Sequence, residues 1–77
     1  MTRFLLLFSN DVAELADLGA EELKMTKDIT DVITEAVKSK YAFMKVIWFS
    51  GGEMHDLGTA DLGVMKHERE KDNVSLR

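Results

Sequence analysis

The fold is decided by residues 28–52, DITDVITEAVKSKYAFMKVIWFSGG, where a helical pattern is followed by a strand pattern and a glycine turn. Asp28 is a suitable N-cap for the helix, and Lys38 and Lys40 lie at the end where the helix dipole favours cations. Five apolar side chains recur at i, i+3, i+4, i+7 and i+8, the spacing of one helix face: Ile29, Val32, Ile33, Ala36 and Val37. We predict an amphipathic helix over residues 28–40.

A strand and a hairpin are predicted directly after this helix. Residues 42–49, AFMKVIWF, are rich in strong strand formers and end at a Ser-Gly-Gly-Glu segment. Since glycine readily takes a positive φ, we predict a β-hairpin around Gly51-Gly52. The returning strand should cover about residues 53–59, with a further short element near residues 62–65. Glycines within both indicate a bulge or a turn.

The N-terminal part predicts a strand and a short helix. Residues 2–8, TRFLLLF, form an apolar run that is too short for a helix and is typical of a buried strand. Residues 11–18, DVAELADL, predict a possible short helix, with Ser9 or Asn10 as the N-cap and Gly19 just beyond the C-terminus.

Residues 21–26 alternate weakly, with Leu23 and Met25 on one side, and form either a short edge strand or an irregular link. The order of elements predicts one α+β domain over residues 1–66, with a small mixed or antiparallel sheet and one main helix. Residues 67–77 are expected to be a charged C-terminal tail or a frayed helix end.

Composition restricts the partners. The chain has 77 residues, no cysteine and a formal net charge of −4. A domain of this size buries only about 60–65% of its unfolded surface, and without disulfides or thiolate metal ligands oligomerisation is the leading remedy. Negative charge disfavours binding to nucleic-acid phosphates, so we expect no nucleic-acid partner. A local basic patch could still form from Arg3, Lys38, Lys40, Lys45, Lys66 and Arg69.

The apolar N-terminal run is also short for a membrane segment. Residues 4–8 follow a single basic residue and break at a Ser-Asn-Asp cluster, which is too short for a signal peptide or a bilayer span. We therefore expect a cytoplasmic protein with no membrane partner.

The predicted Gly51–His67 hairpin contains five residues whose side chains can bind a metal ion: Glu53, His55, Asp56, Asp61 and His67. His55 and His67 are twelve positions apart with two glycines between them, which matches no HxxxH or HExxH signature. Strand alternation would also send His55 and Asp56 to opposite faces. Thus His55, Asp56 and His67 are weak metal candidates, and we expect no cofactor. The alternative function is a small-ligand or metal-binding domain that uses this hairpin.

No serine lies in a catalytic motif. Ser50 precedes Gly51-Gly52, whereas the hydrolase elbow reads GxSxG. The glycine pair also lacks the lysine and the following helix of a phosphate-binding loop. Because so small a domain has little room for a water-excluding pocket, we expect no enzymatic activity.

Both main strands are apolar on both faces, and alternation places Trp48 and Phe49 on opposite sides of the sheet. The main helix covers one face, so the other requires the helix at residues 11–18, a second subunit or a target protein. We expect an apolar sheet face to be the contact surface, with these aromatic residues: Trp48, Phe49, Phe43, Phe4 and Phe8.

This pattern predicts a non-enzymatic protein–protein interaction or regulatory module that forms a homodimer or binds a larger protein. In size, acidity and layout the chain is similar in kind to small accessory or inhibitory proteins encoded by phages and mobile elements, which act by occupying a surface of a larger protein.

Overall fold

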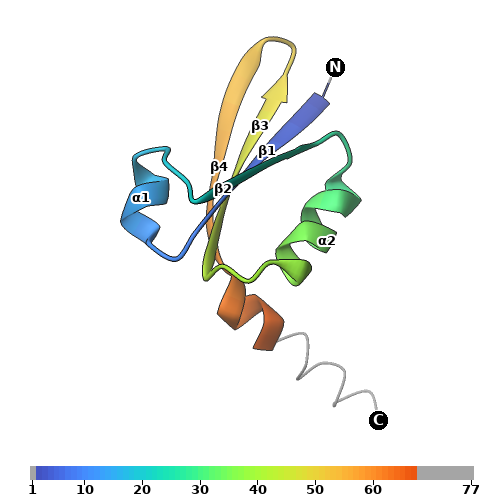
Figure 1. Ribbon diagram of the computed structural model, residues 1–77. Coiled ribbons are helices and arrows are strands. Elements are labelled where there is room, and N and C mark those ends of the chain that lie inside the picture. Colours follow the sequence, from blue (N-terminus) through green and yellow to red (C-terminus); the bar gives the residue numbers. More distant parts are fainter. Residues whose placement is uncertain (1, 68–77) are drawn as a thin grey trace.

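The computed structural model describes residues 2–67, in which four strands form one sheet with helices on both of its sides (Figure 1). In chain order the elements are β1 (Thr2–Ser9), α1 (Val12–Ala16), β2 (Glu22–Thr26), α2 (Ile29–Lys38), β3 (Phe43–Ser50) and β4 (Glu53–Asp61). Residues 62–67 are helical. The strand order is β2-β1-β3-β4, and every neighbouring pair is antiparallel. The predicted α+β class is confirmed, and the sheet is antiparallel throughout.

The predicted hairpin joins β3 to β4. Ser50 pairs with Glu53, which leaves a two-residue loop of Gly51 and Gly52. Both glycines have positive φ, 59° and 85°. Two consecutive positive φ values match the right-handed twist of the flanking strands, and glycine takes them without steric cost.

β4 contains a bulge, as the glycine in this strand indicated. The strand ends at Asp61, two residues beyond the predicted end. Its register against β3 shifts between Lys45 and Ile47. At the shift Gly58 has a φ of 96°, and its N–H donates to Oδ1 of Asp56 at 2.8 Å. A residue with positive φ inside a strand accommodates the extra residue of a bulge.

The helix α2 begins where the sequence predicts and ends two residues earlier. Oδ1 of Asp28 accepts a hydrogen bond from the Thr30 N–H at 2.9 Å, which confirms Asp28 as the N-cap. At the other end Ser39 has an extended backbone and terminates the helix. The Ser39 carbonyl accepts a hydrogen bond from the Lys66 ammonium, so the helical segment 62–67 contacts the C-terminal end of α2.

The predicted apolar stripe of α2 is only partly buried. Val32 and Ala36 are buried against the sheet, whereas Ile29, Ile33 and Val37 are exposed. The cause is the position of the helix, which lies over β1 and β2, the strands it contacts most. Three outward residues of the stripe therefore have no strand beneath them.

The short helix α1 begins later than predicted. Asp11 is the N-cap, because its Oδ1 accepts from the Ala13 N–H at 2.9 Å. Ser9, a candidate cap, is the last residue of β1, and its hydroxyl donates to Oε1 of Glu14 at 2.7 Å. Oδ1 of Asn10, the other candidate, accepts a hydrogen bond at 2.9 Å from the N–H of Ala42, the residue just before β3. Both predicted caps are wrong because tertiary contacts engage their side chains.

The C-terminal end of α1 places a leucine in the left-handed region. Leu18 has a φ of 62°, and its N–H donates to the Leu15 carbonyl at 3.0 Å. The Gly19 N–H donates to the Glu14 carbonyl at 2.8 Å. These two bonds form a Schellman motif with Leu18, not Gly19, at the position that glycine usually takes. Gly19 is instead required for close approach, since a Cβ there would lie 2.9 Å from Cγ of Glu14.

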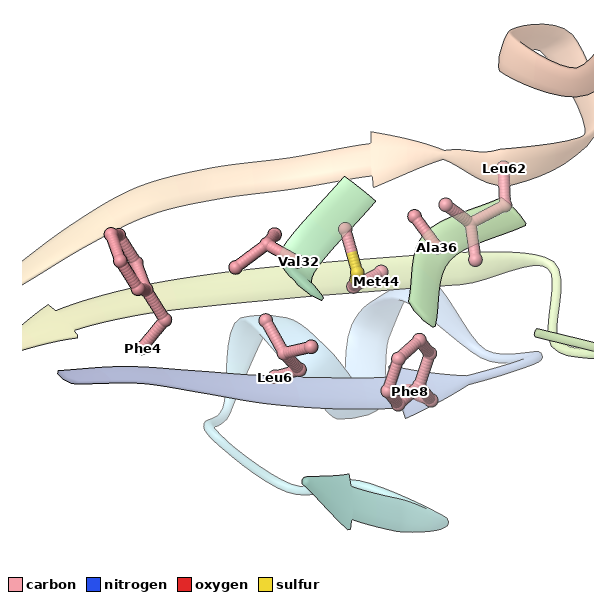
Figure 2. Close-up of a cluster of buried hydrophobic side chains, with 7 residues drawn as sticks. All are labelled: Phe4, Leu6, Phe8, Val32, Ala36, Met44 and Leu62. Carbon is pink, nitrogen blue, oxygen red and sulfur yellow. The ribbon is translucent and has the colours of Figure 1, made fainter. Parts of the chain in front are cut away.

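The main core lies between the sheet and α2. Figure 2 shows this cluster, to which β1, β3, α2 and the segment after β4 contribute the side chains of Phe4, Leu6, Phe8, Val32, Ala36, Met44 and Leu62. On the opposite face Leu15 of α1 packs with Leu7 and Ile47 in a second, smaller cluster. The two helices thus lie on opposite sides of the sheet (Figure 1).

Candidate interaction surface

The sheet face that bears α1 is only partly covered. α1 has five residues and spans about 7.5 Å, whereas the eight residues of β1 extend about 26 Å. Leu15 is the one fully buried residue of α1. The helix therefore shields the part of the face around Leu7 and Ile47 and leaves the remainder uncovered.

Five apolar side chains that share this face make up what we call the open sheet face: Leu5, Leu23, Met25, Phe49 and Met54. The three on the outer strands are 60%, 55% and 58% exposed, for Leu23, Met25 and Met54 respectively. Leu5 pairs directly with Met25, and Phe49 with Met54, so a half-buried side chain of a central strand adjoins each of these methionines. Contiguous exposed apolar side chains are typical of contact surfaces, and methionine adapts its shape to different partners.

Trp48 and Phe49 do face opposite sides of the sheet, as strand alternation predicts. Phe49 belongs to the open sheet face, where it is half-buried beside the Leu7–Ile47 cluster. Trp48 packs against the core on the α2 side, with its ring 5.1 Å from that of His55. Of this pair, only Phe49 is available to a partner that binds on the α1 side.

The other aromatic candidates have different surroundings. Phe43 is half-buried and packs against the cluster beneath α1. Phe4 and Phe8 point toward α2 and are 9% and 1% exposed (Figure 2). These two are core residues and add almost no surface for a partner.

One charged residue is buried beside the open sheet face. Lys45 is 6% exposed, and its Nζ lies 3.0 Å from Oδ2 of Asp56 on β4. The hydrogen bond from Lys45, with a second from the Gly58 N–H, holds the pKa of Asp56 below its ordinary value. A lysine predicted as part of a possible basic patch is instead inside the protein, where its charge is compensated by a carboxylate.

The weak metal candidates are not brought together. His55 pairs with Trp48 on the α2 side of the sheet, whereas Asp56 pairs with Ile47 on the other side. His67 is the last residue that the structure describes, in the helical segment that follows β4. Within residues 2–67 no group of three or more histidine, cysteine, aspartate or glutamate side chains could hold a metal ion.

Two hollows adjoin α2, one of about 190 Å³ at its C-terminal end and one of about 460 Å³ beside β2. Both are lined by Lys24 and Glu35, whose Nζ and Oε2 lie 2.6 Å apart. This hydrogen bond raises the pKa of Lys24 and lowers that of Glu35. Charged residues make up five of the eight that line the smaller hollow and three of the six that line the larger one.

The sequence contained a signal for part of the open sheet face. The alternation of residues 21–26 placed Leu23 and Met25 on one side, but it did not show which face of the sheet they would join. The contributions of Leu5 and Met54 depend on register between strands, which alternation within one strand does not reveal.

No helix within residues 2–67 has the length and apolar character required to cross a bilayer. Comparison of the chain with protein-family models, with curated proteins and with solved structures found no match.

Proposed function

We propose that this chain is a non-enzymatic protein–protein interaction module whose contact surface is the open sheet face. The observation that carries the proposal is the exposure of Leu23, Met25 and Met54 on the same face. Scattered exposed apolar residues are common on any protein, but here three share one sheet face with the half-buried Leu5 and Phe49 between them, and such a patch is a feature of binding surfaces.

The arrangement around this surface suits a binding role. Ile47 lies at its centre, fully buried between β1 and β4, so the surface rests on a rigid sheet. Side chains on paired strands keep fixed spacing, which lowers the entropy lost when a partner binds. Phe49 contributes an aromatic ring, the type of side chain most enriched at the centre of interfaces.

The proposal is tested by photo-crosslinking in cells, with a benzoylphenylalanine placed at Met25 or at Met54 of the full chain. Both positions should give discrete protein adducts. The matched control is Ile33, which is 53% exposed but lies on α2. Equal adducts from Ile33, or no adducts from Met25 and Met54, would show that the open sheet face is not the contact surface.

A second variant checks that the adducts require the surface itself. Phe49→Lys in the chain that carries the crosslinker at Met54 should abolish its adducts, because an unpaired charge would be buried in the interface. Circular dichroism of the variant must still show the native spectrum. Persistence of the adducts in a folded Phe49→Lys variant would contradict the proposal.

A further inference from the structure

We infer that the free edge of β2 binds an extended segment of a partner protein as a fifth, antiparallel strand, in which apolar side chains alternate with basic ones. The inference rests on the proposed function and deepens it, because the added strand would extend the open sheet face beyond Leu23 and Met25. Three features support it: the backbone groups at this edge, the side chains of β2, and the hollow between β2 and α2.

The backbone groups of two residues in β2 point away from the sheet. In the part of the chain that the structure describes, β2 is an outer strand that pairs with β1 alone. The Phe8 carbonyl accepts a hydrogen bond from the Glu21 N–H at 2.8 Å, so the backbone of Phe8 faces β2. Since direction alternates along an antiparallel pair, the register makes Lys24 face β1 as well. Leu23 and Met25 must therefore direct their backbone groups outward.

These outward groups specify the conformation of what binds there. The N–H and C=O of Leu23 and Met25 are two donors and two acceptors at strand spacing, and the three central residues of β2 are exposed. An antiparallel strand matches them, because alternate residues of such a pair exchange both hydrogen bonds. A lysine often blocks an edge of this kind, but the Lys24 ammonium is held by Oε2 of Glu35 at 2.6 Å. The edge is thus open to a strand.

The side chains of β2 predict apolar residues on one side of the added strand. Leu23 and Met25 belong to the open sheet face and are 60% and 55% exposed. An adjacent strand lies about 4.8 Å away, so its side chains on this face would pack directly against both of them. Apolar side chains at these positions would remove exposed apolar surface from water, which stabilises the complex.

The hollow predicts a basic residue on the other side of the added strand. Its volume is about 460 Å³, and it lies between β2 and the flank of α2 that bears Asp31 and Glu35. Oδ2 of Asp31 accepts a hydrogen bond at 3.0 Å from the neutral hydroxyl of Thr26, and among the described residues no cation pairs with this carboxylate. Glu35, by contrast, is compensated by Lys24. A lysine or arginine opposite Thr26 would extend along the hollow toward Asp31.

The experiment is hydrogen exchange of the full chain by NMR, with and without a capped heptapeptide in which valine alternates with lysine. In the free chain the amide protons of Leu23 and Met25 should exchange fast and that of Lys24 slowly, because only the last is bonded to β1. Saturating peptide should slow the exchange of the first two by roughly tenfold or more. Asp31→Asn should raise the peptide dissociation constant by about twofold to fivefold. The matched control, Glu53→Gln on the opposite edge of the sheet, should leave it unchanged.

Control peptides separate strand addition from attraction between charges. A heptapeptide of the same composition, with its valines and lysines in separate blocks, should protect neither amide proton, because it cannot place apolar side chains on one face and basic ones on the other. Alternation of valine with glutamate should bind more weakly than alternation of valine with lysine. Equal protection by the block peptide would overturn the inference.

The remaining outcomes also decide the inference. No protection of Leu23 and Met25 by the alternating peptide would exclude strand addition at this edge. Slow exchange of both in the free chain, which becomes fast on dilution, would show that the edge pairs with a second copy instead. An unchanged dissociation constant for Asp31→Asn would exclude the basic residue in the hollow. The photo-crosslinks from Met54, on the opposite outer strand, test the proposed function independently of these results.

Discussion

Replacing Leu15 by alanine should remove most of the packing that holds α1 on the sheet. Leu15 is completely buried and contacts the side chains of Leu7 and Ile47. The other residues of α1 are half-buried at most, so no neighbouring side chain can replace this contact. The change therefore leaves a cavity between the helix and the sheet.

The magnitude follows from the groups that are lost. Leu→Ala removes three buried carbon groups at about 0.8 kcal/mol each, or roughly 2.4 kcal/mol, before any cavity is counted. With the cavity, Leu→Ala changes in cores cost about 2–5 kcal/mol. We expect a loss of about 3 kcal/mol in the free energy of unfolding, which for a domain of this size lowers Tm by roughly 12–24 °C.

The assay is urea denaturation, monitored by the fluorescence of Trp48, the one tryptophan of the chain. The protein concentration is kept fixed, because any association of the folded chain would raise its apparent stability. Val12→Ala is the matched control, since Val12 lies on the same helix and is 50% exposed. It should change the free energy of unfolding by no more than about 0.5 kcal/mol. A Leu15→Ala cost below about 1 kcal/mol would refute the packing of α1 described above.

Leu18→Gly should raise the free energy of unfolding by about 0.5–1 kcal/mol. The left-handed conformation costs leucine about 1–2 kcal/mol, and glycine's extra chain entropy offsets only part of that gain. A variant that unfolds at a lower urea concentration would contradict this prediction. Gly19→Ala should destabilise the protein in the same assay. The new Cβ would lie 3.2 Å from the Glu14 carbonyl oxygen and 2.9 Å from Cγ of Glu14. An unchanged urea midpoint would count against the tight turn. The hydrogen bond from Lys45 lowers the pKa of Asp56, so this pair stabilises the fold at neutral pH. The stabilisation is lost as the pH falls from 3.8, the ordinary pKa of this carboxyl, through its lower pKa in the folded protein. Asp56→Asn should therefore be less stable than the unaltered chain at pH 7 and approach it in acid, whereas a constant difference between the two urea midpoints at every pH would argue against the ion pair.

The sequence predicted the helix α2 well and its burial poorly. Periodicity identifies which residues share a helix face, but it does not show how wide a surface that face meets. Ile29 and Ile33 belong to the predicted stripe and are exposed because α2 lies toward the β2 side of the sheet, where Lys24 of β2 pairs with Glu35. The position of a helix over a sheet depends on such long-range contacts.

The start of α1 shows a similar limit at shorter range. Ser9, Asn10 and Asp11 are all good N-cap residues, so local preference does not choose among them. The choice is made by the hydrogen bonds of Ser9 to Glu14 and of Asn10 to the start of β3. Only Asp11 keeps its side chain for the helix.

The sequence predicted an apolar sheet face as the contact surface. Three of the five aromatic residues assigned to it lie on the α2 side instead: Trp48, Phe4 and Phe8. Alternation correctly separated Trp48 from Phe49, because side-chain direction along a strand is a local property. β1 is apolar on both faces, so nothing local shows that Phe4 and Phe8 point toward α2 and Leu5 points away. That assignment depends on which side of the sheet receives each helix.

The bulge in β4 also affects how readily another strand can add to this edge of the sheet. β4 is an outer strand, and its free edge presents backbone groups to solvent. The extra residue at Gly58 interrupts their regular spacing, and Glu53, Asp56 and Asp61 place negative charge along the strand. A second chain cannot continue the hydrogen-bond ladder along all of β4, which disfavours the addition of strands at this edge. This leaves β2, the other outer strand, as the edge at which another strand could add.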